Sequence, residues 1–173
     1  LIFLLPIKSF SLIEVDITRG NLNPLPLAVS PLSIDEKSRK SFESLLKKKN
    51  IGSEISSIVE NNLRTSGLFN PLNKDAFLQA PDIANLKPRF EDWNLIKAQA
   101  LITGKVSFVD EKLRVEFRLW DILAGKEMMA LAFTTVPNNW RRVGHIISDK
   151  VYERLTGEKG YFDTRIIYVA EEG

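Results

Sequence analysis

Cysteine is absent from this chain of 173 residues, which excludes disulfides, CxxC redox chemistry and thiolate metal sites within it. Histidine is almost absent: His145 stands alone, without an HExxH pattern or carboxylates at metal-ligand spacing. A charge bias is missing too, because 24 basic and 22 acidic residues give a net charge of +2. That balance argues against nucleic-acid binding, which usually requires a strongly basic face. The remaining composition, 44% hydrophobic and 27% charged, is sufficient for one domain with a core.

Catalytic motifs are also missing. The chain has no GxSxG sequence to mark a nucleophilic serine. The stretch Gly157-Glu158-Lys159-Gly160 lacks the spacing of a phosphate-binding loop and follows a predicted helix, so we interpret it as a helix end and linker. Asp149 lies four residues after His145, and this spacing predicts a hydrogen bond between the two on one helix face. We therefore expect a structural histidine and no catalytic, cofactor or metal site.

The first eleven residues resemble the end of a secretory signal. Residues 1–7 are apolar, and Ser9 and Ser11 are small residues at the spacing of a cleavage site. We expect residues 1–11 to be a signal remnant and the mature protein to begin near Leu12, without a membrane span, because seven apolar residues cannot cross a bilayer that needs about 20. A buried core strand is the alternative interpretation of the same residues.

Hydrophobic periodicity predicts a small mixed sheet with helices packed on it, an α/β domain from 12 to 157. Strands are expected at 12–18, 100–109, 113–121 and 126–135, with short extended pieces at 25–29 and 68–72. Pro24, Pro26 and Pro31 lead us to expect 25–29 at a sheet edge or in extended coil. Helices are expected at 38–49, 53–66, 90–96 and 140–156, and 73–88 is predicted to be mostly loop with a helical turn near 74–78.

Two features bear on ligand binding. The basic cluster in 38–49 carries Phe42, Leu45 and Leu46 at helical spacing, which favours the solvated side of an amphipathic helix over an anion site. The three tryptophans, Trp93, Trp120 and Trp140, lie on separate elements, which favours packing over a stacking platform for single-stranded nucleic acid.

Several different short motifs follow one another in a particular order along nearly the whole chain. It consists of Glu14-Val15-Asp16-Ile17, Leu63-Arg64-Thr65-Ser66-Gly67-Leu68-Phe69-Asn70-Pro71-Leu72, Trp93, Ala100-Leu101-Ile102-Thr103-Gly104-Lys105-Val106, Val115-Glu116-Phe117-Arg118-Leu119-Trp120-Asp121, Asn139-Trp140-Arg141-Arg142-Val143-Gly144-His145, Ser148-Asp149, and Leu155-Thr156-Gly157 with Lys159-Gly160 before Thr164-Arg165-Ile166-Ile167-Tyr168-Val169. In this order and spacing the chain resembles the TolB family of the Tol–Pal cell-envelope system.

The resemblance implies an N-terminal domain similar in fold to anticodon-binding domains, followed by a six-bladed β-propeller. Residues 158–173 would then be the linker and the first propeller strand, and the chain would be part of a longer protein. The family implies a periplasmic, non-enzymatic binding protein that needs no cofactor. It would link TolA and the lipoprotein Pal, maintain outer-membrane integrity, support outer-membrane invagination in cell division, and take part in protein and colicin import.

The resemblance also implies a site. The TolA-linked N-terminal strand would correspond to Leu12, Ile13, Glu14, Val15, Asp16, Ile17 and Thr18, whereas Pal would bind mainly to the propeller. A short strand beside proline-rich coil has few ladder bonds, so it could exchange between docked and free states. A small-ligand or nucleic-acid binding module of anticodon-binding-like fold remains the alternative. A hydrolase with a propeller gate is a third possibility, for which no serine or metal site is visible.

Overall fold

A six-stranded mixed sheet organises the molecule. The computed structural model describes residues 23–164. Its strands are β1 (Leu25–Val29), β2 (Ser33–Ile34), β3 (Phe69–Pro71), β4 (Ala100–Val109), β5 (Lys112–Asp121) and β6 (Lys126–Thr135). Along the sheet they run β3-β1-β4-β5-β6, with β2 also pairing β4. The β3-β1-β4 part and the β2–β4 pair are parallel, and β4-β5-β6 is an antiparallel meander. The predicted mixed sheet with packed helices is confirmed.

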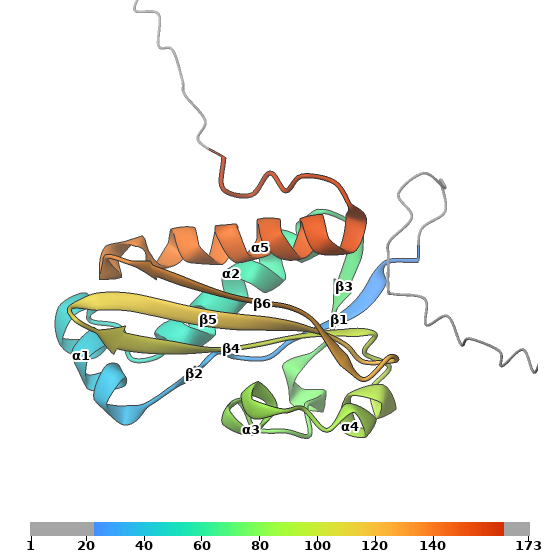
Figure 1. Ribbon diagram of the computed structural model, residues 1–173, viewed down its shortest axis with the longest axis horizontal. Helices are drawn as coiled ribbons and strands as arrows, with labels where there is room; N and C mark the ends of the chain where they lie inside the picture. Colours follow the sequence, from blue (N-terminus) through green and yellow to red (C-terminus); the bar gives the residue numbers. More distant parts are fainter. Residues whose placement is uncertain (1–22, 165–173) are drawn as a thin grey trace, which may run out of the picture.

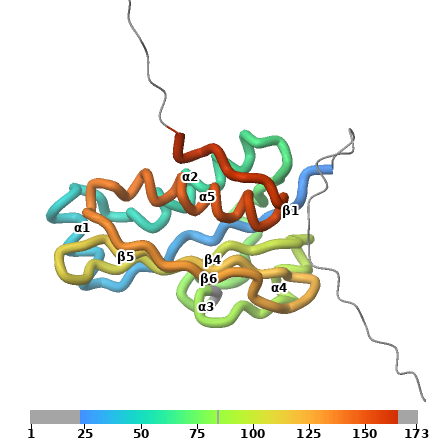
Figure 2. The backbone as a smooth tube through the Cα atoms, turned by 45° about the horizontal axis from the view of Figure 1, so that its top comes forward, coloured from blue at the N-terminus to red at the C-terminus, as the bar shows by residue number. Residues whose placement is uncertain are grey.

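Helices cover both faces of this sheet. They are α1 (Glu36–Leu46), α2 (Ile51–Thr65), α3 (Pro81–Leu86), α4 (Phe90–Leu95) and α5 (Trp140–Thr156), with 3-10 turns η1 (Lys74–Ala76) and η2 (Pro137–Asn139). Helices α2 and α5 lie on one face, which we call the helical face, and α3 and α4 lie on the other (Figure 1). The backbone tube in Figure 2 shows the same layers, with α1 at one end of the molecule.

The main core lies between the helical face and the meander. Along α5 the residues Val143, Ile147, Val151 and Leu155 recur at helical spacing and are buried against inward-facing residues of β5 such as Phe117. Close contact between α2 and α5 depends on Gly144, since a Cβ there would press on the side chain of Ile58. The predicted position of the last helix on the sheet is therefore confirmed.

The expected position of 25–29 at a sheet edge is wrong. Strand β1 lies between β3 and β4, and Leu27 is fully buried. Proline is tolerated because the ladder with β4 begins at Leu27, one residue after Pro26, so the missing N–H removes no bond from that ladder. The carbonyl of Pro26 still accepts from the N–H of Gln99 at 2.9 Å.

Several helix boundaries differ from the prediction. The basic helix spans 36–46 instead of 38–49, because Lys47 takes a left-handed conformation with φ 55° and ends it. Helix α2 starts at Ile51, with Asn50 at its N-cap, two residues before the predicted start at 53. Gly67, just after α2, has a positive φ of 75°, a conformation that favours glycine at a helix end. Within the predicted loop 73–88, the expected turn is present as η1, and α3 was missed.

Candidate functional site

The predicted binding segment 12–18 lies outside the described residues. The described chain begins at Asn23 and enters the middle of the sheet at Leu25. The segment is therefore connected, through residues 19–24, to one of the most buried strands of the domain. Of the predicted linker and first propeller strand, 158–173, residues 165–173 lie outside the described part, and residues 158–164 form no strand.

His145 belongs to a polar contact between two helices. Its Nδ1 lies 2.9 Å from Nδ2 of Asn62 on α2, and the same amide donates to Oγ of Ser148 at 3.0 Å. Because an amide nitrogen can only donate, Nδ1 of His145 is the acceptor in this contact. The predicted hydrogen bond between His145 and Asp149 is wrong. The Asp149 carboxylate instead accepts from the backbone N–H groups of Phe162 and Asp163. His145 connects α2 to α5, as a structural histidine would.

Metal-binding side chains do not gather at one place in residues 23–164. These residues include no group of three or more His, Cys, Asp or Glu side chains able to hold a metal ion.

The three tryptophans are packed inside the domain, with exposed fractions of 1% for Trp93, 7% for Trp120 and 5% for Trp140. The Nε1–H of Trp120 donates to Oγ1 of Thr103 at 2.9 Å. The prediction of packing tryptophans is confirmed, and these three side chains cannot serve as an exposed stacking platform.

A glutamate on α2 shows how the described charges are used. Burial by itself would raise the pKa of Glu60, but hydrogen bonds and the nearby charges of Lys74 and Arg64 outweigh it and lower the pKa. The carboxylate contacts Nζ of Lys74 at 2.7 Å and the guanidinium of Arg64 at 2.6 Å. Both cations are bound to one acid, so this group ties η1 to α2 and leaves no free positive site there.

An open cleft of about 760 Å³ lies at the end of the molecule formed by α1, the β4–β5 turn and η2. Its lining residues are Lys40, Ser41, Ser44, Leu45, Leu46, Phe108, Glu111, Pro137 and Asn138. Leu45, one of the apolar residues at helical spacing in the basic helix, is 57% exposed on the cleft wall. Asp110 and Glu111 form the adjoining turn with φ of 48° and 59°, the conformation of a tight hairpin turn. The cleft wall is mixed: polar side chains from α1 and the β4–β5 turn stand beside Leu45, Leu46 and Phe108, and Lys40 and Glu111 carry its charges.

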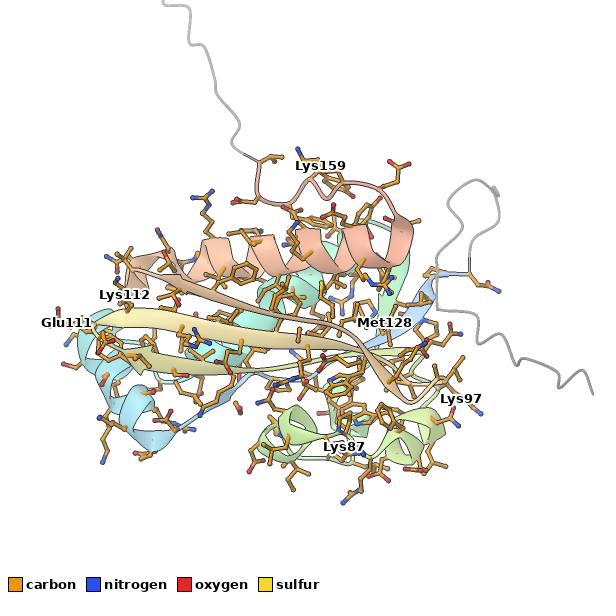
Figure 3. The ribbon with its side chains drawn as sticks, viewed as in Figure 1. Lys87, Lys97, Glu111, Lys112, Met128 and Lys159 are labelled. Atoms are coloured by element: carbon orange, nitrogen blue, oxygen red, sulfur yellow. The ribbon has the colours of Figure 1, made fainter. Side chains whose placement is uncertain are left out.

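The outer edge of β6 is a second available surface. No further strand pairs with it in the described part of the chain, and its residues from Met128 (Figure 3) to Thr135 carry no charge. Lys126 and Glu127 are the charged residues at its start, where they would discourage strand addition. The opposite edge strand, β3, has three residues and contains Pro71. An extended partner segment would therefore find its longest open ladder at β6.

The segment after α5, predicted as a linker, is held against that helix by several contacts although its side chains are partly exposed. Tyr152 of α5 is in ring contact with Tyr161 at 5.5 Å and with Phe162 at 5.8 Å between centroids. Burial raises the pKa of the Tyr152 hydroxyl, with smaller contributions from Tyr161 and Glu158.

No described helix combines the length and the apolarity needed to cross a bilayer. The open surfaces described above are the cleft at the end of α1 and the outer edge of β6. Segment 12–18 remains a prediction, since nothing in residues 23–164 tests it.

Comparison with known proteins agrees with this fold. The TolB amino-terminal domain family matches residues 13–128, well over half of the chain. Tol-Pal system protein TolB of Pelagibacter ubique (strain HTCC1062) is 82% identical over 173 residues, which is 100% of this chain and 39% of that protein. The crystal structure of TolB from Acinetobacter baumannii superposes with a TM-score of 0.65 at 20% identity, over 87% of this chain and 33% of that one, and shares the fold. The chain belongs to the TolB family of the Tol–Pal system, of which it carries the amino-terminal domain.

Proposed function

We propose that the protein is a periplasmic, non-enzymatic adaptor that links TolA and the lipoprotein Pal, and so supports outer-membrane integrity and invagination during cell division. A role in protein and colicin import belongs to the same proposal. The observation that carries it is the 82% identity to a Tol-Pal system protein TolB over the whole chain. The chain spans 39% of that relative's length, so the activity of the whole protein is part of the proposal.

The interior of the described domain supports a binding role. Its histidine joins two helices and its tryptophans are packed. Its open surfaces are a cleft and a strand edge, which suit contact with another polypeptide. A six-bladed propeller after residue 158 would supply the Pal contacts, and residues 1–11 would direct export.

We further propose that segment 12–18 is the TolA-linked element. Ile13, Val15 and Ile17 alternate with Glu14 and Asp16, so an added strand would present an apolar and an acidic face. Backbone pairing would supply affinity, and the alternating side chains would supply selectivity.

The test uses the full-length protein exported behind a heterologous signal, with 12–18 replaced by seven Gly and Ser residues. Binding of the TolA periplasmic domain should weaken by at least about tenfold. If the segment acts separately from the fold, as proposed, the unfolding midpoint should move by less than about 2 °C.

Two matched variants distinguish the faces of the strand. A triple change of Ile13, Val15 and Ile17 to Ser should reproduce the loss, and a double change of Glu14 and Asp16 to Ser should have a smaller effect. The proposal fails if TolA and Pal binding are both unchanged, or if the replacement unfolds the domain without a separable effect on binding.

A further inference from the structure

The chain folds back on itself after α5. Gly157 ends the helix with φ 76°, and the N–H of Glu158 donates to Oγ1 of Thr156 at 3.1 Å. Residues 158–163, which we call the strap, then run back along α5 toward its first turns (Figures 1 and 2). Lys159 lies on the strap above the helix (Figure 3).

One carboxylate in the middle of α5 holds the strap. Oδ1 of Asp149 accepts from the N–H of Phe162 at 2.7 Å, and Oδ2 accepts from the N–H of Asp163 at 3.1 Å. Two successive backbone donors thus converge on a single ionised side chain, and such charge-assisted hydrogen bonds are stronger than neutral ones. This use of Asp149 also explains why it is not bonded to His145.

The contact requires glycine at one position of the strap. A Cβ on Gly160 would overlap the backbone and the side chain of Asp149, so a larger residue could not come this close. The closeness of the two chains is what brings the next residues within reach of the carboxylate.

Two further contacts extend the attachment. The guanidinium of Arg142 donates from Nε to both carboxylate oxygens of Asp163 and from a terminal nitrogen to one of them, each at 3.1 Å. Tyr152 lies between Phe162 and Phe69 of β3, with ring centroids 5.8 Å and 6.1 Å away. The strap is therefore tied to α5 along its length and, through Tyr152, to the sheet.

We propose that Asp149 is the positioning residue of this strap, which fixes the direction in which the chain leaves the domain. The part of the protein after Asp163 is then held to α5 instead of being tethered through a flexible linker. A free six-residue linker would let its ends vary over roughly 13 Å, by the square-root scaling of flexible chains. With the strap docked, a displacement of α5 moves the starting point of whatever follows, which couples the two parts mechanically.

The first test measures hydrogen exchange in the full-length protein. In Asp149→Ala the amides of Phe162 and Asp163 should exchange at least about tenfold faster, while the amides of the β4–β5 hairpin keep their protection. Gly160→Ala leaves the carboxylate in place but blocks the approach, so it should give the same pattern. Lys150→Ala, an exposed neighbour that pairs with Glu153, is the matched control and should change neither set.

The second test measures the coupling itself. The chain has no cysteine, so a Lys112→Cys label and a second label in the following part of the protein report their distance by single-molecule energy transfer. The distribution should broaden in Asp149→Ala and in Gly160→Ala, and stay as in the parent in Lys150→Ala.

Three outcomes overturn the proposal. Unchanged exchange at Phe162 and Asp163, or an unchanged distance distribution, would mean that Asp149 does not hold the strap or that the strap does not fix the exit. Loss of hairpin protection in both variants would mean that these residues belong to the fold and not to a separable strap. None of these results concerns TolA or Pal, so the adaptor proposal stands or fails separately.

Discussion

The two faces of the sheet are covered by cores of different size and different construction. On the helical face, α2 and α5 bury a continuous set of aliphatic residues against the meander. The opposite face carries a small cluster made of Ala28, Trp93, Ala98, Leu101, Trp120 and Ile122. Near this cluster, the carboxamide of buried Gln79 donates to the carbonyl of Arg89 at 2.7 Å and accepts from its N–H at 3.0 Å. Apolar area dominates on the first face, whereas specific polar contacts hold the chain against the second.

The helical face should respond most strongly to loss of volume. Phe117 is buried, stacks on Phe133 with an interplanar angle of 16°, and lies at the centre of the main core. Phe117→Ala should lower the free energy of unfolding by about 3–5 kcal/mol, because it removes a large apolar side chain and leaves a cavity. Urea denaturation followed by circular dichroism measures the change.

Phe133→Ala is the internal control for this experiment. Its side chain is half-buried on the edge strand β6, so the loss should be clearly smaller. A loss at Phe117 below about 1.5 kcal/mol, or one equal to that at Phe133, would contradict the assignment of the dominant core to this face.

The small cluster should respond to loss of a polar contact. Trp120 donates its indole N–H to buried Thr103, whereas the indole N–H of Trp93 is buried with no hydrogen-bond partner among the described residues. Both Trp→Phe changes remove the same atoms, but Trp120→Phe also leaves the Thr103 hydroxyl without its partner. Trp120→Phe should therefore cost about 1 kcal/mol more than Trp93→Phe. Thermal unfolding of the two variants side by side measures the difference, and equal losses would show that the contact to Thr103 contributes little.

The sequence was most informative where structure is local. The hairpin strands and the last helix followed directly from alternation and helical spacing, since each is long enough to display its period. The family resemblance came from motif order across the chain, and the match to residues 13–128 agrees with it.

The predictions from sequence were wrong where contacts between distant parts of the chain determine the structure. Residues 25–29 were predicted at a sheet edge or in extended coil because proline cannot donate a hydrogen bond to a neighbouring strand. Whether a hydrogen bond is lost depends on the residue at which each strand pairing begins, and the sequence does not reveal that residue. Helix α3 has six residues and no side-chain cap, too short to show a period, although Pro81 at its first turn was an available signal. The assignment of segment 12–18 as a binding site rests on the family resemblance. The strap was not predicted, because the sequence suggested His145 as the partner of Asp149, whereas the structure pairs Asp149 with Phe162.

Loss of a polar contact beside the large core should lower the free energy of unfolding less than loss of a core side chain. The N-cap of α1 is the contact for which we expect the smallest effect. Asp35 accepts from the N–H and the hydroxyl of Ser38 at 2.8 Å and 2.9 Å, and that hydroxyl accepts from the N–H of Phe108 on β4. Asp35→Ala should cost about 1 kcal/mol, as loss of an N-cap does. Asn50→Ala should cost only a few tenths, because Asn50 caps α2 without a side-chain hydrogen bond.

The pH dependence of that difference identifies its source. The backbone hydrogen bond from Ser38 lowers the pKa of Asp35 most; burial opposes it, and the Ser38 hydroxyl and the charge of Lys105 add to the lowering. A carboxyl whose pKa is lower in the folded state stabilises the fold above its unfolded pKa and loses that contribution as pH falls through the folded value. The gap in unfolding free energy between the parent and Asp35→Ala should hence be full at pH 7 and shrink below about pH 4, whereas the Asn50→Ala gap stays flat. Urea titrations at pH 7 and at pH 3 measure both gaps, and an Asp35 gap that stays constant would mean that the charge of the cap is not what stabilises α1.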